Sequence, residues 1–411
     1  MQAEKPKNRG WVDVMNRFFI SGWAVSGGDE PAEVSILIDG RKCATVAATL
    51  FRPDLKEISR DGHCAFQFFP GPYAGNAARV IEVYSDGQIL GRIDLAADTP
   101  NTRSASGRNP WDSETPYDYS SSWLSAPQYV AHWNAKITGN PAQHWLDYVF
   151  HNYIAAGGPT ASKSALLLGS NEGHMELRLC ELGFIGQIVA TDIAAKALAR
   201  AATRVRERGF KNVTYKVADL NRDRVDGPFD FILCEGVLHH IENIDFCISS
   251  LHRSLRPGGL LVGMEYVGPY RFQLSAKEVA WINAALGAMP RGLRPVAAPG
   301  DPSVPMALHE QAIVHYTAPS IREMLAFDPS EAVAGHLLRD ALQRSFRFIE
   351  DKPLGGGVLL YAENHFPFGR AKCDPFVAAW LDVLIKIEDT IHNTGILPHH
   401  AWFFVATPSD A

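Results

Sequence analysis

Cysteine is scarce in this chain. Its 411 residues include six cysteines, and no two of them form a CxxC pair. This spacing provides neither a structural zinc site nor the paired framework of a disulfide-rich domain. Cys234 lies inside the apolar run FDFILCEG and is predicted to be a small core residue.

Long apolar runs and an excess of positive charge are also absent. No stretch reaches about 18 uninterrupted apolar residues, and the polar start MQAEKPKNRGWVD lacks the apolar core of a signal peptide. The sequence therefore predicts no transmembrane helix and a cytoplasmic location. The net charge of −6 gives no general attraction to nucleic acid or to an anionic membrane. Neither is expected as a partner, whereas a homo-oligomer stays open.

What is present is a chain of globular composition, long enough for two or three domains. Residues 8–98 predict a small antiparallel β-sandwich, because short β-rich runs alternate there with Gly and Asp turns. These runs are FFISGWAV, AEVSILIDG, CATVAAT, CAFQFFP, ARVIEVYSDG and ILGRIDL. Residues 99–118, rich in Pro, Ser, Asn and Thr, are interpreted as a linker. Two roles stay open for the aromatic residues of this domain, packing in its core or stacking on sugar rings at its surface. These residues are Trp11, Trp23, Tyr73 and Tyr84.

Residues 119–408 are predicted to form a second domain of the α/β class. A helical lead-in over about 120–156 contains Trp123, Asn134 and His144. From Ser164 onward, strands such as SALLLG, QIVATD and VTYKVAD alternate with helices such as AAKALARAATRVRERG. This alternation predicts a doubly wound, mostly parallel sheet. A helical insertion is expected near 270–350, and GGGVLLYAENHF and HAWFFVAT are expected to supply the last two strands.

The predicted strand ends carry the candidate binding residues. Gly169 directly follows the first buried strand, and the pattern G-x-N-x-G up to Gly173 fails the full dinucleotide fingerprint. Asp192 ends the second strand, where its carboxylate could accept hydrogen bonds from ribose hydroxyls or cap the next helix. Asp219 ends the third strand, where it could accept a hydrogen bond from an exocyclic amine or form a turn.

This succession of motifs resembles class I S-adenosylmethionine-dependent methyltransferases. The matching stretches are LLLGSNEGHMEL, VATDIAAKALARAATRV, YKVADLN, FDFILCEGVLHHIENID and LHRSLRPGGLLVGMEYVG. The chain departs from the family at Asn171, where glycine is usual, but asparagine tolerates positive φ better than most residues. A narrower resemblance, carried by SSWLSAPQYVAHWNAKITGNPAQHW and EYVGPYRFQ, is to a bacterial group with an N-terminal β module.

The resemblance implies a Rossmann-like sheet that binds S-adenosylmethionine along its carboxyl edge. The residues implied to hold this cofactor are Gly169, Ser170, Asn171, Gly173, Asp192, Ile193, Asp219, Leu220, Cys234 and Glu235. His239 and His240 are the candidates for removing a proton from an acceptor, since imidazole titrates near neutral pH. Glu265 and Tyr266 could hold or orient the acceptor, and Arg271 could pair with an anionic one.

No metal site is predicted, because the histidines at 309, 315, 365, 399 and 400 lack a spacing such as HExxH. The favoured function is methyl transfer to oxygen or nitrogen of a small molecule, with a sugar, glycan or secondary-metabolite precursor as the acceptor. An NAD-dependent oxidoreductase is disfavoured, because Asn171 and His174 replace two glycines of the pyrophosphate turn. A non-catalytic binding protein on the same fold remains the other alternative.

Overall fold

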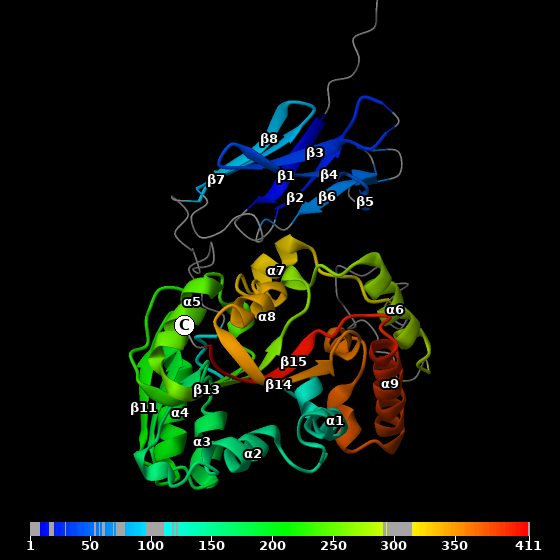
Figure 1. Ribbon diagram of the computed structural model, residues 1–411. Helices are drawn as coiled ribbons and strands as arrows, with labels where there is room; N and C mark the ends of the chain where they lie inside the picture. Colours follow the sequence, from blue (N-terminus) through cyan, green and yellow to red (C-terminus); the bar gives the residue numbers. More distant parts are fainter. Residues whose placement is uncertain are drawn as a thin grey trace, which may run out of the picture. The chain divides into compact units, whose positions relative to one another are not determined.

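A computed structural model of the chain, shown in Figure 1, divides into two compact units, residues 1–101 and 102–411. Each unit has a hydrophobic core made of its own residues. The residues that the structure describes are 9–15, 20–28, 30–52, 55–56, 58–59, 62–68, 70, 79–95, 111–116, 119–120, 122–290, 293 and 315–409.

The first unit consists of two four-stranded antiparallel sheets. One has the order β1 (Arg9–Met15), β2 (Ile20–Val25), β6 (His63–Phe68), β5 (Leu50–Phe51). The other has the order β4 (Arg41–Ala47), β3 (Glu33–Ile38), β7 (Val80–Ser85), β8 (Gln88–Asp94). Ile20 and Phe66 from the first sheet share one core with Val34, Ile36 and Ile81 from the second. The predicted small β-sandwich is confirmed.

Turn chemistry fixes the hairpins of this sandwich. Asp39 and Gly40 join β3 to β4 with φ angles of 49° and 77°, and both positive values match the twist of a two-residue hairpin turn. The strand β1 was not among the predicted runs. Trp11 on β1 is 61% exposed, whereas Trp23 and Tyr84 are half-buried. Tyr73 lies outside the described residues.

A seven-stranded sheet forms the second unit. Its order is β11 (Val213–Val217), β10 (Gln187–Asp192), β9 (Ser164–Leu168), β12 (Phe229–Glu235), β13 (Leu255–Tyr266), β15 (Ala401–Pro408), β14 (Phe346–Gly355). Strands β9 to β13 pair in parallel, and β15 runs antiparallel to both of its neighbours. The strand order reverses between β9 and β12, which is where open α/β sheets bind ligands.

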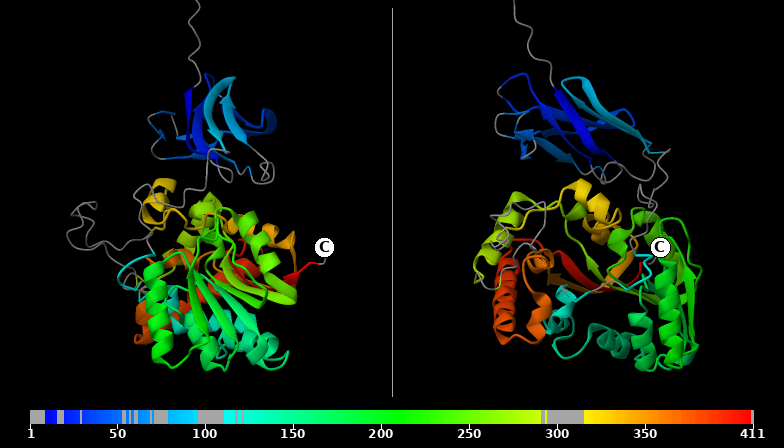
Figure 2. Two further views of the ribbon diagram at one scale, coloured as in Figure 1. Left: turned by 90° about the vertical axis from the view of Figure 1, so that its left-hand side faces the viewer. Right: turned by 180° about the vertical axis from the view of Figure 1, so that it is seen from behind.

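Helices cover both faces of this sheet, as Figures 1 and 2 show. Leu167 and Leu233 share a core with residues of α1 (Pro127–Thr138), α2 (Trp145–Val149), α3 (His174–Glu181), α6 (Ala276–Gly287) and α9 (Pro375–Asn393). Helices α4 (Ala195–Glu207), α5 (Ile244–Ser254) and α8 (Gly335–Gln343) contact β10, β13 and β14, and their described residues contribute none to that core. Because strand side chains alternate between faces, these three helices belong to the opposite face. The doubly wound, mostly parallel α/β fold is confirmed.

The prediction for the last strands was half wrong. HAWFFVAT forms β15, but β14 ends at Gly355, and Leu359–Ala362 is a 3-10 helix. Gly355 and Gly356 have φ angles of 102° and 82°, which break the extended backbone. The buried Glu388 carboxylate then accepts the backbone N–H groups of Val358 and Leu359, at 2.9 and 2.7 Å. A contact from a distant helix therefore decides this segment.

The lead-in residues have structural partners. The Nδ1 atom of His144 accepts the N–H of Leu146 and caps α2, and Asn134 Oδ1 accepts the N–H of Trp145 at 3.1 Å. Trp123 packs beside Trp133, with ring centroids 4.5 Å apart. Among the described residues, no helix combines the length and the apolar character that crossing a bilayer requires.

Candidate functional site

The loop after β9 is held in an unusual backbone conformation. Gly169, Asn171 and Gly173 have φ angles of 61°, 45° and 81°. A Cβ added at Gly169 would lie 2.7 Å from Val237 Cγ2, and one at Gly173 would lie 2.8 Å from Ala201 Cβ. The expectation that Asn171 keeps the turn at positive φ is confirmed. Ser170 is buried, and its hydroxyl bonds the Glu176 carboxyl group.

Asp192 joins this loop to the start of α4. Its Oδ2 accepts the N–H of Asn171 and its Oδ1 accepts the N–H of Ala194, both at 2.8 Å. Burial raises the pKa of Asp192, although these backbone N–H groups oppose the rise. Asp192 therefore bonds the N–H of Ala194, the N-cap residue of α4, and is not itself the N-cap that the sequence offered as an alternative. Each of its oxygens still has a lone pair for a further donor, since a carboxylate has about four acceptor sites.

Asp219 follows β11, the strand next to β10. The N–H of Ala218 donates to Asp192 O at 2.9 Å, so the two strand ends lie side by side. Asp219 Oδ1 accepts from the backbone N–H and the side-chain amide of Asn221, at 3.0 and 3.1 Å, which is a turn role. Ile193 is 43% exposed at this edge, whereas Leu220 is buried.

The end of β12 faces the same edge. The Cys234 side chain is fully buried and contacts Val262 O at 3.5 Å, as predicted for a core residue, so only its backbone could contact a ligand. Burial and the negative charge of Glu265 raise the pKa of Glu235 to about 7. A Cβ added at Gly236 would lie in ordinary van der Waals contact with His239 Cε1, at 3.9 Å, so the His239 ring lies beside this strand end.

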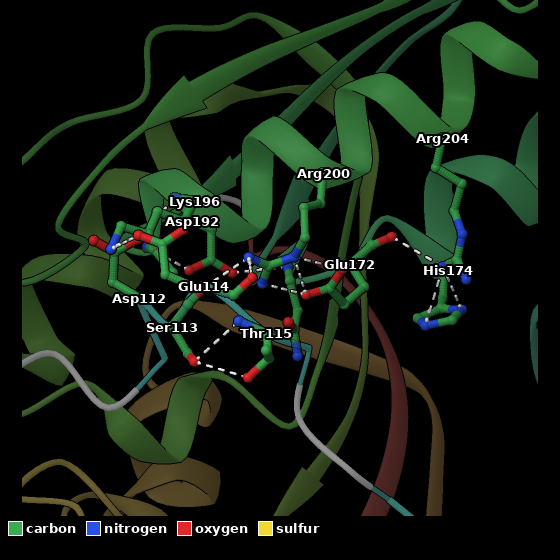
Figure 3. A network of polar contacts seen from close by, with 12 residues as sticks. Asp112, Ser113, Glu114, Thr115, Glu172, His174, Asp192, Lys196, Arg200 and Arg204 are labelled. Atoms are coloured by element: carbon green, nitrogen blue, oxygen red, sulfur yellow. Dashed lines mark hydrogen bonds and ion pairs between the residues drawn. The ribbon is translucent and has the colours of Figure 1, made fainter.

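Residues 111–115, here called the strap, cross the N-terminal end of α4 (Figure 3). Asp112 Oδ1 accepts the N–H of Lys196 at 2.8 Å. Arg200 donates to Ser113 O at 2.7 Å and pairs with Glu172 of the β9 loop at 2.6 Å. The strap thus connects the loop after β9, the start of α4 and, through Trp111, the histidines described next.

His239 lies between two carboxylates. It belongs to the 3-10 helix Leu238–His240, and its Nδ1 is 2.8 Å from Glu265 Oε2, while its Nε2 is 3.5 Å from Glu331 Oε1. Glu265 Oε1 also accepts the N–H groups of Val237 and Leu238, at 3.0 and 2.9 Å. Burial alone would lower the pKa of His239, but the two carboxylates outweigh it and raise the pKa to about 10.

The pKa of His240 shifts in the direction opposite to that of His239. Its Nδ1 lies 3.1 Å from Ser330 Oγ, and Ser330 Oγ donates to Asp328 Oδ1 at 2.7 Å. Its Nε2 lies 3.8 Å from Glu331 Oε2. Burial and the positive charge of His239 lower the pKa of His240. The strap residue Trp111 packs edge-on against the His240 ring, at 5.8 Å, and donates to Asp328 Oδ2 at 2.9 Å.

Tyr266 and Arg271 are buried, and the Tyr266 ring lies 5.7 Å from that of His239. The Tyr266 hydroxyl donates to Pro269 O at 2.9 Å and lies 3.0 Å from the Tyr361 hydroxyl, so it serves a buried network. Arg271 is buried with φ of 45°, its Nε bonds the Tyr270 hydroxyl at 2.9 Å, and its Nη1 has no hydrogen-bond partner among the described residues.

Comparison with known proteins decides the class. Residues 166–263, which contain the loop after β9, Asp192, Asp219 and both histidines, match the model of the methyltransferase domain family. An uncharacterized methyltransferase of Mycobacterium bovis is 28% identical over 155 residues, covering 37% of this chain and 75% of that protein. The second unit contains a class I S-adenosylmethionine-dependent methyltransferase domain. The narrower bacterial group stays a prediction.

Other relatives match about a third of the chain or less. The demethylmenaquinone methyltransferase of Tropheryma whipplei is 30% identical over 115 residues, 28% of this chain and 46% of that protein. The fusarielin synthase of Gibberella zeae is 26% identical over 168 residues, 36% of this chain and 6% of that protein. The chain thus spans less than half of the length of both.

Several residues of the site escaped the sequence analysis. Asp328, Ser330 and Glu331 lie between α7 (Ile321–Phe327) and α8, and the N–H of Ala334 anchors this loop to His239 O at 2.9 Å. Trp111 and Asp112 fall in the segment interpreted as a linker. Nothing in the spacing of the segment FDPSEAVAG, residues 327–335, pointed to the histidines, because this segment reaches them only through the tertiary fold.

Proposed function

We propose that this protein transfers a methyl group from S-adenosylmethionine to a small acceptor molecule. The observation that carries the proposal is the meeting of the β9 loop, Asp192 and the Glu235–His240 segment at one sheet edge, within the part that matches the methyltransferase family. The family match favours this reading over an NAD-dependent oxidoreductase. If the cofactor binds but no acceptor is methylated, the alternative of a non-catalytic binding protein is favoured.

The residues present fit this cofactor. The backbone of the β9 loop is curved by three positive φ angles, and the oxygens of Asp192 keep acceptor capacity for ribose hydroxyls. Gly236 brings the end of β12 next to the His239 ring, with 3.9 Å between an added Cβ and His239 Cε1. Gly169 and Asn171 would hold the amino-acid end, and Asp219 with Leu220 would lie towards the adenine. When bound, the cofactor supplies a methyl group on a sulfonium that is already strongly electrophilic.

The other requirements of methyl transfer are met by side chains of the protein. The site has to align the acceptor, exclude water and accept the acceptor's proton. Neutral His240, kept in one orientation by Ser330, is the group suited to accept that proton. His239, fixed by Glu265 and Glu331, positions its neighbour and holds positive charge beside it.

We propose a sugar, glycan or secondary-metabolite precursor as the acceptor, methylated on oxygen or nitrogen. Two relatives are named for a compound, fusarielin or demethylmenaquinone, and not for a protein or a nucleic acid. Arg271 offers a buried cation for an anionic group on such an acceptor.

Calorimetric titration with S-adenosylhomocysteine and, separately, with NADH tests the cofactor. We expect binding of the first and none of the second. Incubation with methyl-labelled S-adenosylmethionine and a bacterial metabolite extract, followed by mass spectrometry, should then show a labelled product. Absence of S-adenosylhomocysteine binding by the folded protein would refute the proposal.

A further inference from the structure

Two imidazoles and one carboxylate converge beside the proposed acceptor position. The Nε2 atoms of His239 and His240 lie 3.5 and 3.8 Å from the two oxygens of the same carboxyl group, that of Glu331. One ligand atom from each of the three residues lies within 4.8 Å of the other two. No sequence motif predicts this group of three residues, because Glu331 lies in the loop before α8, far from the histidines in the chain.

We propose that His239, His240 and Glu331 form a binding site for a divalent transition-metal cation. Two imidazole nitrogens with one carboxylate are ligands that Zn²⁺ and its first-row neighbours accept, and such sets of three leave positions open for substrate. Ligand atoms bonded to Zn²⁺ at about 2.0–2.2 Å sit roughly 3.3 Å apart. Small side-chain shifts would close the observed spacings to that value.

The contacts behind the two histidines support this assignment. The Nδ1 of His239 faces Glu265 Oε2 at 2.8 Å, and the Nδ1 of His240 faces Ser330 Oγ at 3.1 Å. Ser330 is itself held by Asp328. Metal-binding histidines typically give their second ring nitrogen to such an acceptor, which fixes the ring and leaves the other nitrogen for the cation.

The local charge also suits a cation. Glu265, Glu331 and Asp328 bring three carboxylates to the two imidazoles, and their side chains are 0%, 15% and 2% exposed. The positive charge of Arg271 also acts on Glu331 and offsets part of this negative charge.

The inference deepens the proposed function and leaves the cofactor site unchanged. A cation on both Nε2 atoms would occupy the lone pair that His240 otherwise offers to a proton. The bound cation would instead lower the pKa of an acceptor hydroxyl that coordinates it. The proton of that hydroxyl would then pass to solvent. During transfer, the sulfonium C–S bond breaks and a C–O bond forms. The acceptor class narrows to molecules with a hydroxyl that can bind a metal.

Metal binding can be measured on the untagged full-length chain after chelator treatment. We expect one Zn²⁺ per chain after dialysis, by elemental analysis, and visible absorption bands typical of nitrogen–oxygen coordination after addition of Co²⁺. Glu331→Gln and His240→Gln should weaken Zn²⁺ binding at least 100-fold. Glu265→Gln, which leaves all three ligands in place, should weaken it about 10- to 100-fold.

His252→Gln and Glu363→Gln are the matched controls, because both residues lie outside the cluster. These two variants should bind Zn²⁺ with the same affinity as the unmodified chain. Binding of S-adenosylhomocysteine and thermal unfolding are measured for every variant. Failure to bind Zn²⁺ or Co²⁺ by a chain that still binds S-adenosylhomocysteine would overturn the metal site and spare the proposed function. Equal Zn²⁺ affinity in Glu331→Gln would overturn it as well.

Discussion

Gly169 shows how a single residue is constrained from two directions. Its φ of 61° disfavours any side chain, and an added Cβ would also lie 2.7 Å from Val237 Cγ2. We expect Gly169→Ala to lower the free energy of unfolding by about 2–4 kcal/mol, the sum of a left-handed backbone penalty of about 1–2 kcal/mol and overpacking of similar size. Chemical denaturation of the second unit measures this change.

Gly209 provides the matched control. Its φ is 85°, but a Cβ there would meet nothing within 4 Å, so Gly209→Ala isolates the backbone penalty. We expect it to cost about 1–2 kcal/mol. Equal losses in the two variants would show that the contact with Val237 has no energetic weight.

Asp192 accepts two backbone N–H groups and is proposed to bind the cofactor, and a conservative substitution can separate these two roles. We expect Asp192→Asn to weaken S-adenosylhomocysteine binding at least tenfold, because an amide presents one acceptor oxygen in place of two. Since that oxygen can keep one of the two backbone bonds, unfolding should shift by no more than about 1–2 kcal/mol. Titration calorimetry gives the affinity. Asp226→Asn, exposed on the loop after β11, should change neither quantity, and undiminished affinity in Asp192→Asn would remove Asp192 from the site.

His399 makes the second unit sensitive to acid. Burial, together with the positive charges of His392 and Lys136, lowers the pKa of His399 to about 4. The unfolded chain takes up this proton near pH 6.5, so the stabilisation is complete above that pH and is lost as pH falls towards 4. Allowing for partial exposure, we expect His399→Gln to remove about 1 kcal/mol of the loss between pH 7 and pH 4.5. Thermal unfolding at both pH values tests this; an unchanged difference would contradict it.

At the scale of elements, the strap provides a cap that α4 lacks in its own sequence. Ala194 occupies the N-cap position and offers no side-chain acceptor, while Asp112 Oδ1 accepts the N–H of Lys196. We expect Asp112→Ala to cost about 1 kcal/mol and Asp112→Asn much less, as for N-cap residues. Urea denaturation measures both.

The neighbouring ion pair between Glu114 and Lys196 offers a comparison within the strap. Its side chains are 82% and 45% exposed, so Glu114→Gln should change stability by less than about 0.5 kcal/mol. A larger loss in Glu114→Gln than in Asp112→Ala would mean that charge, and not capping, holds the strap.

At the scale of the whole molecule, the two separate cores predict two unfolding events. The core of the β-sandwich contains only residues of the first unit, and the large core of the sheet contains only residues of the second. Differential scanning calorimetry should therefore resolve two transitions. S-adenosylhomocysteine at 100 times its Kd should stabilise only the transition of the second unit, by about 2.7 kcal/mol. A single transition, or a ligand shift of both, would show that the units unfold together.

Much of this fold was predictable from local patterns. Alternation of apolar and other residues before the Asp39-Gly40 turn predicted the hairpin of β3 and β4. Apolar strands separated by helices predicted the succession of elements from β9 to β13. The glycines of the β9 loop and Asp192 were named from their places at predicted strand ends, because parallel strands present their carboxyl ends at one edge. The paired histidines were named from the family resemblance and from the titration of imidazole near neutral pH.

The sequence by itself determined the α/β class, the separate sandwich and the glycine turn after β9, since these depend on periodicities and turns within a few residues. Only the tertiary structure decided the secondary structure of residues 355–366, where Glu388 holds a turn. It also decided the environment of His239 and His240. Their partners Glu331, Ser330 and Trp111 are distant in the chain. Charge and hydrogen bonding act through space, so the protonation of these histidines follows from packing that no local pattern encodes.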